Sequence, residues 1–235
     1  MSVVVLLGAP GAGKGTQAPF LASRLGIPIV ATGDLFRAAV RDGTSLGLEA
    51  RRYMDAGRLV PDAITVGLLL DRLARPDAAD GVILDGFPRT RVQAEALDAA
   101  LAERGASVAV AVLVDVPTDE LVRRMSGRWV CRAAGHPYHE VSSPPRVAGQ
   151  CDLDGSELYQ RTDDRPDTIR ARMAQQLGAL GEVVEHYRDS GVLRSVDGLH
   201  ATGEVAEAIA AAVAAAGLGL RDAAPSAATS SASKS

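Results

Sequence analysis

The sequence predicts an α/β fold in which helices cover both faces of a parallel sheet of five strands. Three observations predict this class. Five short runs rich in β-branched residues are continuously apolar, stretches with helical spacing separate them, and hydrophobic residues make up 47% of the 235-residue chain. Continuously apolar strands are typical of a sheet with both faces buried, because a sheet with one wet face alternates apolar and polar residues.

The expected strands and helices alternate along the chain. We expect strands at residues 3–7, 27–30, 82–84, 108–114 and 192–196, and helices that include residues 35–40, 64–73 and 94–101. The first apolar run is short and has no basic residue before it, so we expect a strand there rather than a signal peptide. Since no apolar stretch reaches the roughly 20 residues of a membrane span, we expect no membrane partner.

Two regions interrupt this alternation and the end of the chain departs from it. Residues 32–60 hold helical segments without a strand, and residues 128–165 hold little periodicity of any kind. Long irregular segments inside a compact domain are usually small lobes, so we expect two insertions on the core. A long helix is expected to begin near Pro166, with Asp164 or a neighbour as its cap. Low complexity predicts that residues 217–235 form a disordered tail.

Composition limits the partners of this protein. A net charge of −4 gives no general attraction to nucleic acid, so we expect no nucleic-acid partner and local placement of any anion-binding cations. The two cysteines, Cys131 and Cys151, are too few for a disulfide scaffold in a chain of this length. A reducing cytoplasm is therefore the expected location.

A glycine-rich loop follows the first strand. Residues 8–17 read GAPGAGKGTQ, which fits the phosphate-binding pattern G-x-x-x-x-G-K-[ST] except that Gly15 separates Lys14 from Thr16. A strand before the loop and a helix after it let backbone N–H groups and the helix N-terminus surround phosphates. The residues expected to bind the nucleotide phosphates there are Gly11, Ala12, Gly13, Lys14, Gly15 and Thr16.

Lys14 is a lysine in a chain that otherwise uses arginine. Of 25 basic residues, only Lys14 and Lys234 are lysine, and Lys234 lies in the expected tail. A lysine ammonium is a compact point charge that fits between two phosphate oxygens, whereas the planar guanidinium of arginine is broader. We therefore interpret Lys14 as required by the chemistry of the loop. The chain contains no Asn, so the Asn-Lys-x-Asp element of small GTPases is absent.

Five motifs together resemble the signatures of adenylate kinases. They are residues 8–17, ATGDLFR at 31–37, GRLVPD at 57–62, DGFPRT at 85–90 and RTDD at 161–164. The resemblance runs in order from residue 1 to about 216, and it accounts for the additional Gly15. It implies a P-loop three-layer fold with inserted lobes and a reversible transfer of a phosphoryl group from Mg-ATP to AMP, giving two ADP.

The resemblance also implies how the chain is divided. Residues 1–31, 61–127 and 166–216 would form the core, residues 32–60 an AMP-binding lobe, and residues 128–165 a lid. The family further implies a monomer, with ATP, AMP and ADP as its nucleotides and Mg²⁺ as the accompanying ion. Because the accepting phosphate is already ionised near pH 7, the reaction needs clustered cations rather than a general base.

Several site residues are carried over by this resemblance. Arg37 and Arg89 match the contacts to the AMP phosphate, and Arg128, Arg161 and Arg172 match the arginines that close over the transferring phosphate. Asp85, at a strand end, is expected to hold Mg²⁺ through water. The remaining residues expected around AMP are Thr32, Arg58, Leu59, Val60, Gly86, Phe87, Pro88 and Gln93, and those expected around ATP are Arg124, Tyr138 and His200.

The expected lid carries an interrupted metal-binding pattern. Long-lid relatives often bind structural zinc through two pairs of ligands, and the matching positions here are Cys131, Ala134, Cys151 and Asp154. A structural zinc site requires four ligands, and Ala134 cannot supply one. We therefore expect no metal bound by the chain itself, although His136, two residues further on, could complete the set.

Three alternatives remain open from the sequence. The donor could be GTP, the acceptor could be another nucleoside monophosphate, or the chain could be a non-catalytic regulator that binds ATP. Thr32 and the long lid favour AMP, because pyrimidine-nucleotide kinases resemble this family with Ala at that position and usually with a short lid. The complete set of cations argues against the regulator.

Overall fold

The core of the structure is a five-stranded sheet whose strands all run parallel. The computed structural model describes residues 1–164 and 166–221, without the side chains of residues 163, 166–167 and 170–172. The strands are β1 (Ser2–Leu7), β2 (Ile29–Ala31), β3 (Gly81–Asp85), β4 (Val108–Asp115) and β8 (Leu193–Asp197), in the spatial order β2-β3-β1-β4-β8. Each pairs in parallel with its neighbours, so the fold class and the five expected strands are confirmed.

Ten helical segments surround the sheet in the described part of the chain. They are α1 (Lys14–Leu25), α2 (Thr32–Arg41), α3 (Ser45–Asp55), α4 (Asp62–Leu73), η1 (Pro76–Ala78), α5 (Arg91–Ala102), α6 (Thr118–Ser126), η2 (Thr162–Asp164), α7 (Pro166–Asp189) and α8 (Thr202–Ala215). The three expected helices fall within α2, α4 and α5. Pro166 is the first residue of α7, where its missing N–H removes no helical bond.

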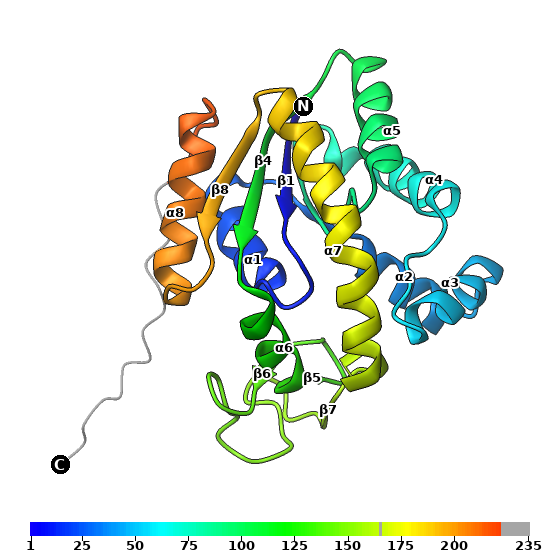
Figure 1. Cartoon of the computed structure of the whole chain (residues 1–235), viewed down its shortest axis with the longest axis vertical. Coiled ribbons are helices and arrows are strands. Elements are labelled where there is room, and N and C mark those ends of the chain that lie inside the picture. Colours follow the sequence, from blue (N-terminus) through cyan, green and yellow to red (C-terminus); the bar gives the residue numbers. More distant parts are fainter. Residues whose placement is uncertain (165, 222–235) are drawn as a thin grey trace.

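Both faces of the sheet are buried, which explains why the strands do not alternate. Val4 and Leu6 of β1 point into a core formed with α1, α6, α8 and the first half of α7. Val3 and Val5 point to the opposite face, against α4, α5 and the second half of α7. Figure 1 shows α8 on one side of the sheet and α4 and α5 on the other.

Two smaller lobes extend from this core. Helices α2 and α3 pack together around Phe36, Ala50 and Val60. The second lobe holds a three-stranded antiparallel sheet in the order β6-β5-β7, from β5 (Arg128–Cys131), β6 (Pro137–His139) and β7 (Leu158–Tyr159). This sheet is not anticipated from the sequence, because strands of two to four residues are too short to show a periodic pattern.

The segment after α8 folds back onto the core for a short distance. The backbone N–H of Arg221 donates to the Arg24 carbonyl at 2.7 Å, and Arg24 Nε donates to the Arg221 carbonyl at 3.0 Å. Leu218 and Leu220 pack against the core as well. Residues 217–221 of the expected tail therefore lie against α1, which differs from the expectation of disorder, and residues 222–235 lie outside the described residues.

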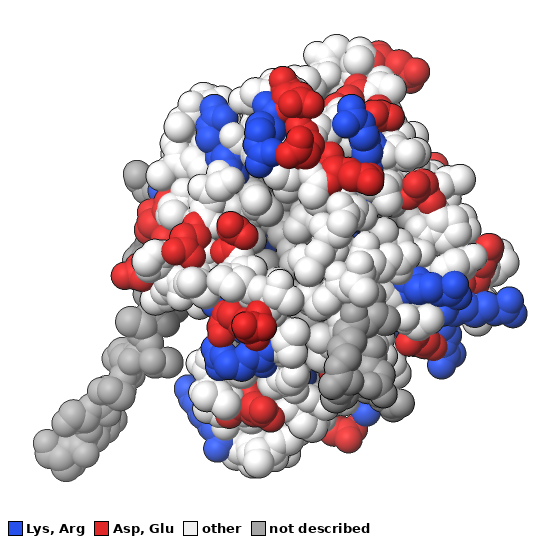
Figure 2. Space-filling view, in the orientation of Figure 1, with Lys and Arg blue, Asp and Glu red and all other residues white. Residues whose placement is uncertain are grey.

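The surface carries charges of both signs. Figure 2 shows acidic and basic side chains interspersed on this face, with basic side chains gathered over α3, where Arg51 and Arg52 are exposed. Among residues 1–164 and 166–221, no helix has the length and apolarity needed to cross a bilayer.

Candidate active site

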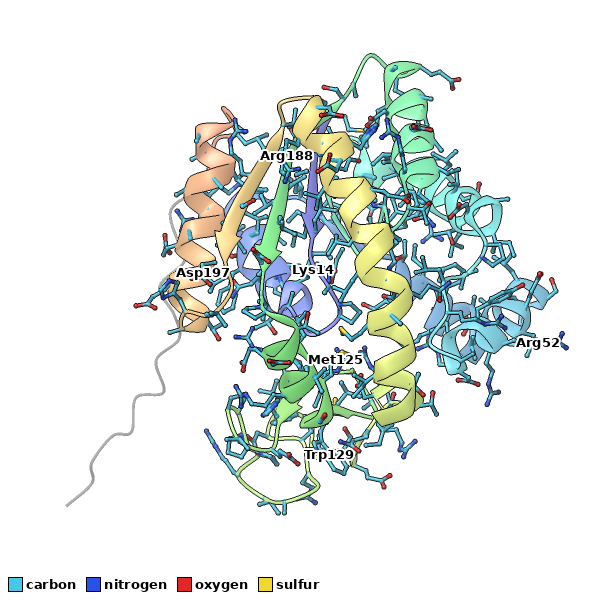
Figure 3. All side chains as sticks on the ribbon, in the orientation of Figure 1. Lys14, Arg52, Met125, Trp129, Arg188 and Asp197 are labelled. Atoms are coloured by element: carbon cyan, nitrogen blue, oxygen red, sulfur yellow. The ribbon has the colours of Figure 1, made fainter. Side chains whose placement is uncertain are left out.

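The glycine-rich loop and Asp85 lie together at the carboxyl edge of the parallel sheet. The loop at residues 8–13 follows β1, and Asp85 ends β3, which pairs with β1 along its length. Ligands of open α/β sheets bind at this edge, because the loops that leave the strands meet there. Figure 3 shows the Lys14 side chain between the end of the sheet and α6, on the side that faces the small lobe with Trp129.

The loop conformation depends on two glycines. Gly11 and Gly13 have φ angles of 87° and 97°, which other residues rarely adopt. A Cβ on Gly11 would also lie 2.9 Å from Met125 Cγ. Gly13 is the N-cap of α1, and among the described residues no side chain caps this end and no acidic residue occupies its first turn. The N–H groups and positive dipole of α1 therefore face the loop.

Lys14 bends back over this loop. Its Nζ donates to the Gly8 carbonyl at 2.7 Å and to the Ala9 carbonyl at 3.1 Å. Asp85 lies close by, since a Cβ on Gly15 would be 3.6 Å from Asp85 Oδ2. The ammonium therefore lies on the loop, and the start of α1 lies beside one carboxylate, an arrangement that suits a polyphosphate accompanied by a divalent cation.

A second cluster forms where β3 ends and α2 begins. The Gly86 carbonyl accepts hydrogen bonds from Thr32 Oγ1 at 2.8 Å and from Arg89 Nε at 2.7 Å. Gln93 Oε1 accepts from the Arg89 N–H at 2.8 Å. Thr32 and Gln93 are both buried, whereas Arg89 is half-buried. Phe87 and Pro88, which link Gly86 to Arg89, are buried as well.

Asp62 also holds this cluster together, and the sequence motifs assign it no role. Its Oδ1 accepts from Gln93 Nε2 at 2.7 Å and from Thr90 Oγ1 at 3.0 Å. Asp62 belongs to the motif at residues 57–62, but its partners lie about 30 residues away in the chain. The packing of α4 against α5 brings them together.

The α2–α3 lobe and the segment after it hold the other residues expected around the acceptor nucleotide. Arg37 pairs with Asp34 of the same helix, with Nε 3.2 Å from Asp34 Oδ1. Arg58 is exposed and lies over the Tyr53 ring at 5.4 Å, whereas Leu59 is half-buried and Val60 is buried. Arg37 and Arg58 thus each contact another residue of the same lobe.

The guanidinium of Arg124 reaches the loop that follows β8. Its Nε donates to Glu120 Oε1 at 2.7 Å, and its Nη2 donates to the Gly198 carbonyl at 2.9 Å. His200, two residues further on, has an exposed side chain 3.4 Å from Asp197 Oδ2. Hydrogen bonds from Arg123 and then Arg124 lower the pKa of Glu120 to about 2. Arg124 and the backbone near His200 therefore share one surface.

Arg128 and Arg161 lie at the two ends of the second small lobe. Arg128 begins β5, and its guanidinium binds both oxygens of Asp164, with Nε at 2.7 Å from Oδ2. Asp164 is buried, so this charge-assisted pair holds Arg128 in one orientation. Arg161 lies between β7 and η2. Arg172 lies on α7, and its side chain is outside the described part of the structure.

Tyr138 points into the interior of the second small lobe. Its hydroxyl donates to Cys151 Sγ at 3.4 Å and accepts from the Asp152 N–H at 2.7 Å. The hydrogen bond to Cys151 and burial raise the pKa of Tyr138. The side chain thus belongs to the core of the second small lobe, with Cys131 and Leu158.

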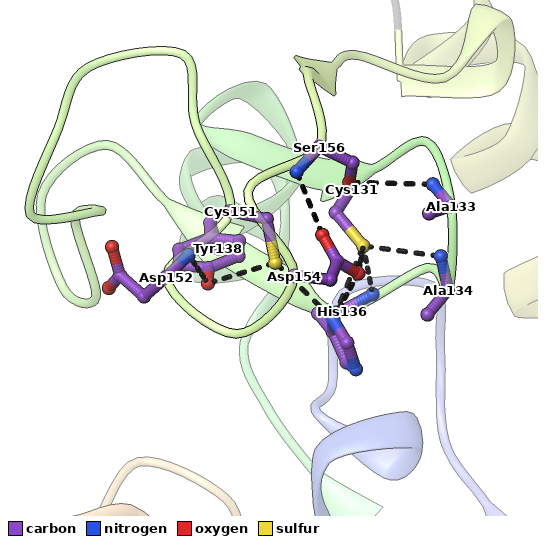
Figure 4. A network of polar contacts seen from close by, with 9 residues as sticks. All are labelled: Cys131, Ala133, Ala134, His136, Tyr138, Cys151, Asp152, Asp154 and Ser156. Carbon is purple, nitrogen blue, oxygen red and sulfur yellow. Dashed lines mark hydrogen bonds and ion pairs between the residues drawn. The ribbon is translucent and has the colours of Figure 1, made fainter.

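Four metal-ligating side chains converge beside Tyr138. Cys131, His136, Cys151 and Asp154 each offer one ligand atom, and these atoms all lie within 4.8 Å of one another (Figure 4). Both cysteines are buried free thiols. His136 therefore lies beside the three ligand residues expected from the sequence, so that four ligand atoms are close together although Ala134 supplies none.

Comparisons with known proteins agree with one another. A family model described as adenylate kinase matches residues 6–192. A curated adenylate kinase of Streptomyces griseus is 48% identical over 211 residues, which cover 89% of this chain and 95% of the relative. One from Lysinibacillus sphaericus is 48% identical over 195 residues, covering 83% and 90%, and one from Listeria monocytogenes is 46% identical, covering 83% and 91%.

Proposed function

This chain belongs to the adenylate kinase family and catalyses reversible phosphoryl transfer between ATP and AMP, and we propose that Lys14 and a set of arginines carry out this transfer at the carboxyl edge of the sheet. The observation on which this assignment of residues rests is that Lys14 lies over the loop at the uncapped start of α1, where Asp85 lies beside Gly15. The accepted and donated phosphates are proposed to meet there.

The donor side of the site is proposed to bind the polyphosphate of ATP. Backbone N–H groups of Gly11, Ala12, Gly13, Gly15 and Thr16 would surround the β-phosphate, and Lys14 would exchange its carbonyl partners for phosphate oxygens. Mg²⁺ bound with ATP would supply further neutralisation of the phosphate charge, and Asp85 suits water-mediated contact with it because its carboxylate faces Gly15. Arg124 and the backbone near Tyr138 and His200 would border the adenine.

The acceptor side is proposed to be the cluster around Gly86. Arg89 and Arg37 would bind the AMP phosphate, and Thr32 and Gln93 would read the adenine. The Thr32 hydroxyl donates to Gly86 and keeps its lone pairs for a base N–H. Residues 58–60, together with residues 86–88, would line the same pocket.

Catalysis is proposed to rest on alignment and charge. The AMP phosphate is largely ionised near pH 7, since its second pKa is about 6, so it attacks without a general base. Arg128, Arg161 and Arg172 would surround the transferring group as the lid closes, and the buried Asp164 orients Arg128 for this purpose. Closure would also exclude water, which would otherwise hydrolyse ATP.

The division of the chain follows from these roles. We propose residues 1–31, 61–127 and 166–216 as the core, residues 32–60 as the lobe for AMP, and residues 128–165 as the lid. The β6-β5-β7 sheet gives the lid its own framework. We also propose that the protein is a monomer in the cytoplasm. Its phosphoryl donor is proposed to be ATP rather than GTP.

The experiment is a survey of acceptors and donors. The purified chain is mixed with Mg²⁺, ATP or GTP, and each of AMP, CMP, UMP, GMP or no acceptor, and every nucleotide is quantified by anion-exchange chromatography. Rapid formation of ADP from ATP with AMP alone is the expected result. Arg89→Ala should lower kcat/KM at least about 100-fold, with the exposed Arg75→Ala as the control. Near-normal turnover in Arg89→Ala would contradict the role of Arg89, and slow loss of ATP indifferent to the acceptor would favour the regulator.

A further inference from the structure

Gln17, the last residue of the GAPGAGKGTQ motif, is a buried polar residue without a role in the transfer described above. It lies on α1 in the turn that follows the glycine-rich loop, and its backbone N–H donates to the Gly13 carbonyl at 3.1 Å. The residue is 4% exposed, so its carboxamide is shielded from water. A buried carboxamide is costly unless it makes a hydrogen bond, and its partner therefore indicates what the side chain does.

The Gln17 side chain contacts a segment near the other end of the chain. Its Nε2 donates to the Thr202 carbonyl at 3.0 Å, 185 positions away. Thr202 is the first residue of α8, which packs against α1. The carbonyl can only accept, so the amide nitrogen faces it, and Oε1 has no hydrogen-bond partner within residues 1–164 and 166–221. One hydrogen bond thus ties the start of α8 to the helix that follows the glycine-rich loop.

The β8–α8 loop, residues 198–201, leads to this bond and is fixed at its other end as well. The Gly198 N–H donates to the Asp115 carbonyl at 2.8 Å, and the Gly198 carbonyl accepts from Arg124 Nη2 at 2.9 Å. A Cβ on Gly198 would lie 2.5 Å from Val116 Cγ2, so the loop passes directly against the segment after β4. The loop is therefore held from α6 and β4 at its start and from α1 at its end.

The middle of the β8–α8 loop offers backbone groups to a ligand. The Leu199 N–H donates to Asp197 Oδ1 at 2.9 Å, and the Ala201 N–H donates to Glu204 Oε2 at 3.1 Å. Between them, the N–H and carbonyl of His200 have no hydrogen-bond partner in the described part of the chain. A carbonyl accepts from the amino group of adenine but meets the carbonyl oxygen of guanine at the same place on the ring. Reading a base in this way requires the loop to lie at a fixed distance from the bound phosphates.

We propose that Gln17 is a positioning residue for the donor base, which sets the distance between the glycine-rich loop and the His200 backbone through its hydrogen bond to Thr202. The inference rests on the donor site proposed above and deepens it, since it names a residue that favours ATP over GTP without contacting the nucleotide. Because both ends of the donor are then bound by parts of one rigid unit, less ordering is required when ATP binds.

The experiment compares a donor with a base and a ligand without one. Dissociation constants of ATP, GTP and inorganic tripolyphosphate, each with Mg²⁺, are measured by calorimetry on the full chain and on Gln17→Met, which has a similar length but no donor. Loss of the bond should weaken ATP at least about fivefold and leave GTP and tripolyphosphate within about twofold. Tripolyphosphate is unaffected because it reaches only the glycine-rich loop. Gln17→Glu, whose ionised carboxylate cannot donate to a carbonyl, should act in the same direction.

The matched control is Gln176→Met. Gln176 is also a buried glutamine whose Nε2 donates to a backbone carbonyl, that of Gly57 at 3.3 Å, but it lies on α7 away from the β8–α8 loop. Its replacement should leave the ratio of ATP affinity to GTP affinity unchanged. Urea unfolding of each variant identifies any that does not fold, and KM for AMP in Gln17→Met should stay within about twofold of the original value.

The outcomes separate this inference from the proposed function. An equal loss of affinity for all three ligands would show that Gln17 supports the glycine-rich loop alone, and unchanged affinity for ATP in both Gln17 variants would show that the bond is not needed; either result would overturn the inference and leave the proposed function standing. If the original chain bound ATP no more tightly than tripolyphosphate, no base would be read beside His200, and the proposed donor site would be wrong together with this inference.

Discussion

Asp62 is expected to position Gln93 for AMP, and Asp62→Ala tests this. The variant removes the acceptor of Gln93 Nε2 at 2.7 Å and of Thr90 Oγ1 at 3.0 Å. Gln93 is 1% exposed, so water cannot replace the lost acceptor, whereas Thr90 is half-buried and can use water. A buried donor left without a partner costs about 1–3 kcal/mol, which corresponds to roughly a 5- to 150-fold change in an equilibrium constant.

The assay separates positioning from stability. ADP formation is followed while AMP is varied at saturating ATP, and then while ATP is varied at saturating AMP. We expect KM for AMP to rise at least about fivefold and KM for ATP to stay within about twofold. Urea unfolding should show a loss of about 1–3 kcal/mol. Asp62→Asn, which keeps one acceptor oxygen, should recover part of both effects.

The control for Asp62→Ala is Glu95→Ala. Glu95 pairs with Arg91 on the surface of α5, and both side chains are more than half exposed, so its loss should change neither KM and should cost at most about 1 kcal/mol. If Asp62→Ala lowered stability but left KM for AMP unchanged, Asp62 would be structural only. An equal rise in both KM values would also refute the assignment.

Three further changes have expected outcomes. Lys14→Arg should lower kcat at least about 100-fold without changing the unfolding transition, because the broader guanidinium does not fit the loop; steady-state kinetics and urea unfolding check this. Gly86→Ala should lower the free energy of unfolding by at least about 1 kcal/mol and reduce kcat/KM for AMP, since Gly86 has a φ of 73° and a Cβ there would lie 2.8 Å from Arg89 Nη2. The pKa of Glu120 falls from 4.5 to about 2 in the folded chain, so its stabilising contribution is complete above pH 4.5 and is lost as the pH falls toward 2. Glu120→Gln should remove that part of the acid dependence of unfolding, and an identical pH profile would contradict it.

The parts of the candidate site whose residues are neighbours in the chain can be predicted from the sequence. The loop at residues 8–13 is recognisable because its glycines, the preceding strand and the following helix are consecutive in the chain. The motif residues Thr32, Gly86 and Arg89 were expected near one nucleotide, and the structure brings them together around one carbonyl. Tyr138 was expected beside a base, but its side chain points into the lid, because a strand of three residues gives no pattern to distinguish its inner from its outer face.

The sequence by itself determined the five strands, the phosphate-binding loop and the α/β class, because each depends on residues a few positions apart. Only the tertiary structure decided which side chains support the site. Arg124 meets Gly198 across 74 positions, Arg128 meets Asp164 across 36, and Asp62 meets Gln93 across 31. His136 meets Cys131, Cys151 and Asp154 in the same way, through the turn after β5 and a second turn before β7. Such contacts depend on how separate segments pack, and spacing along a single chain does not encode that packing.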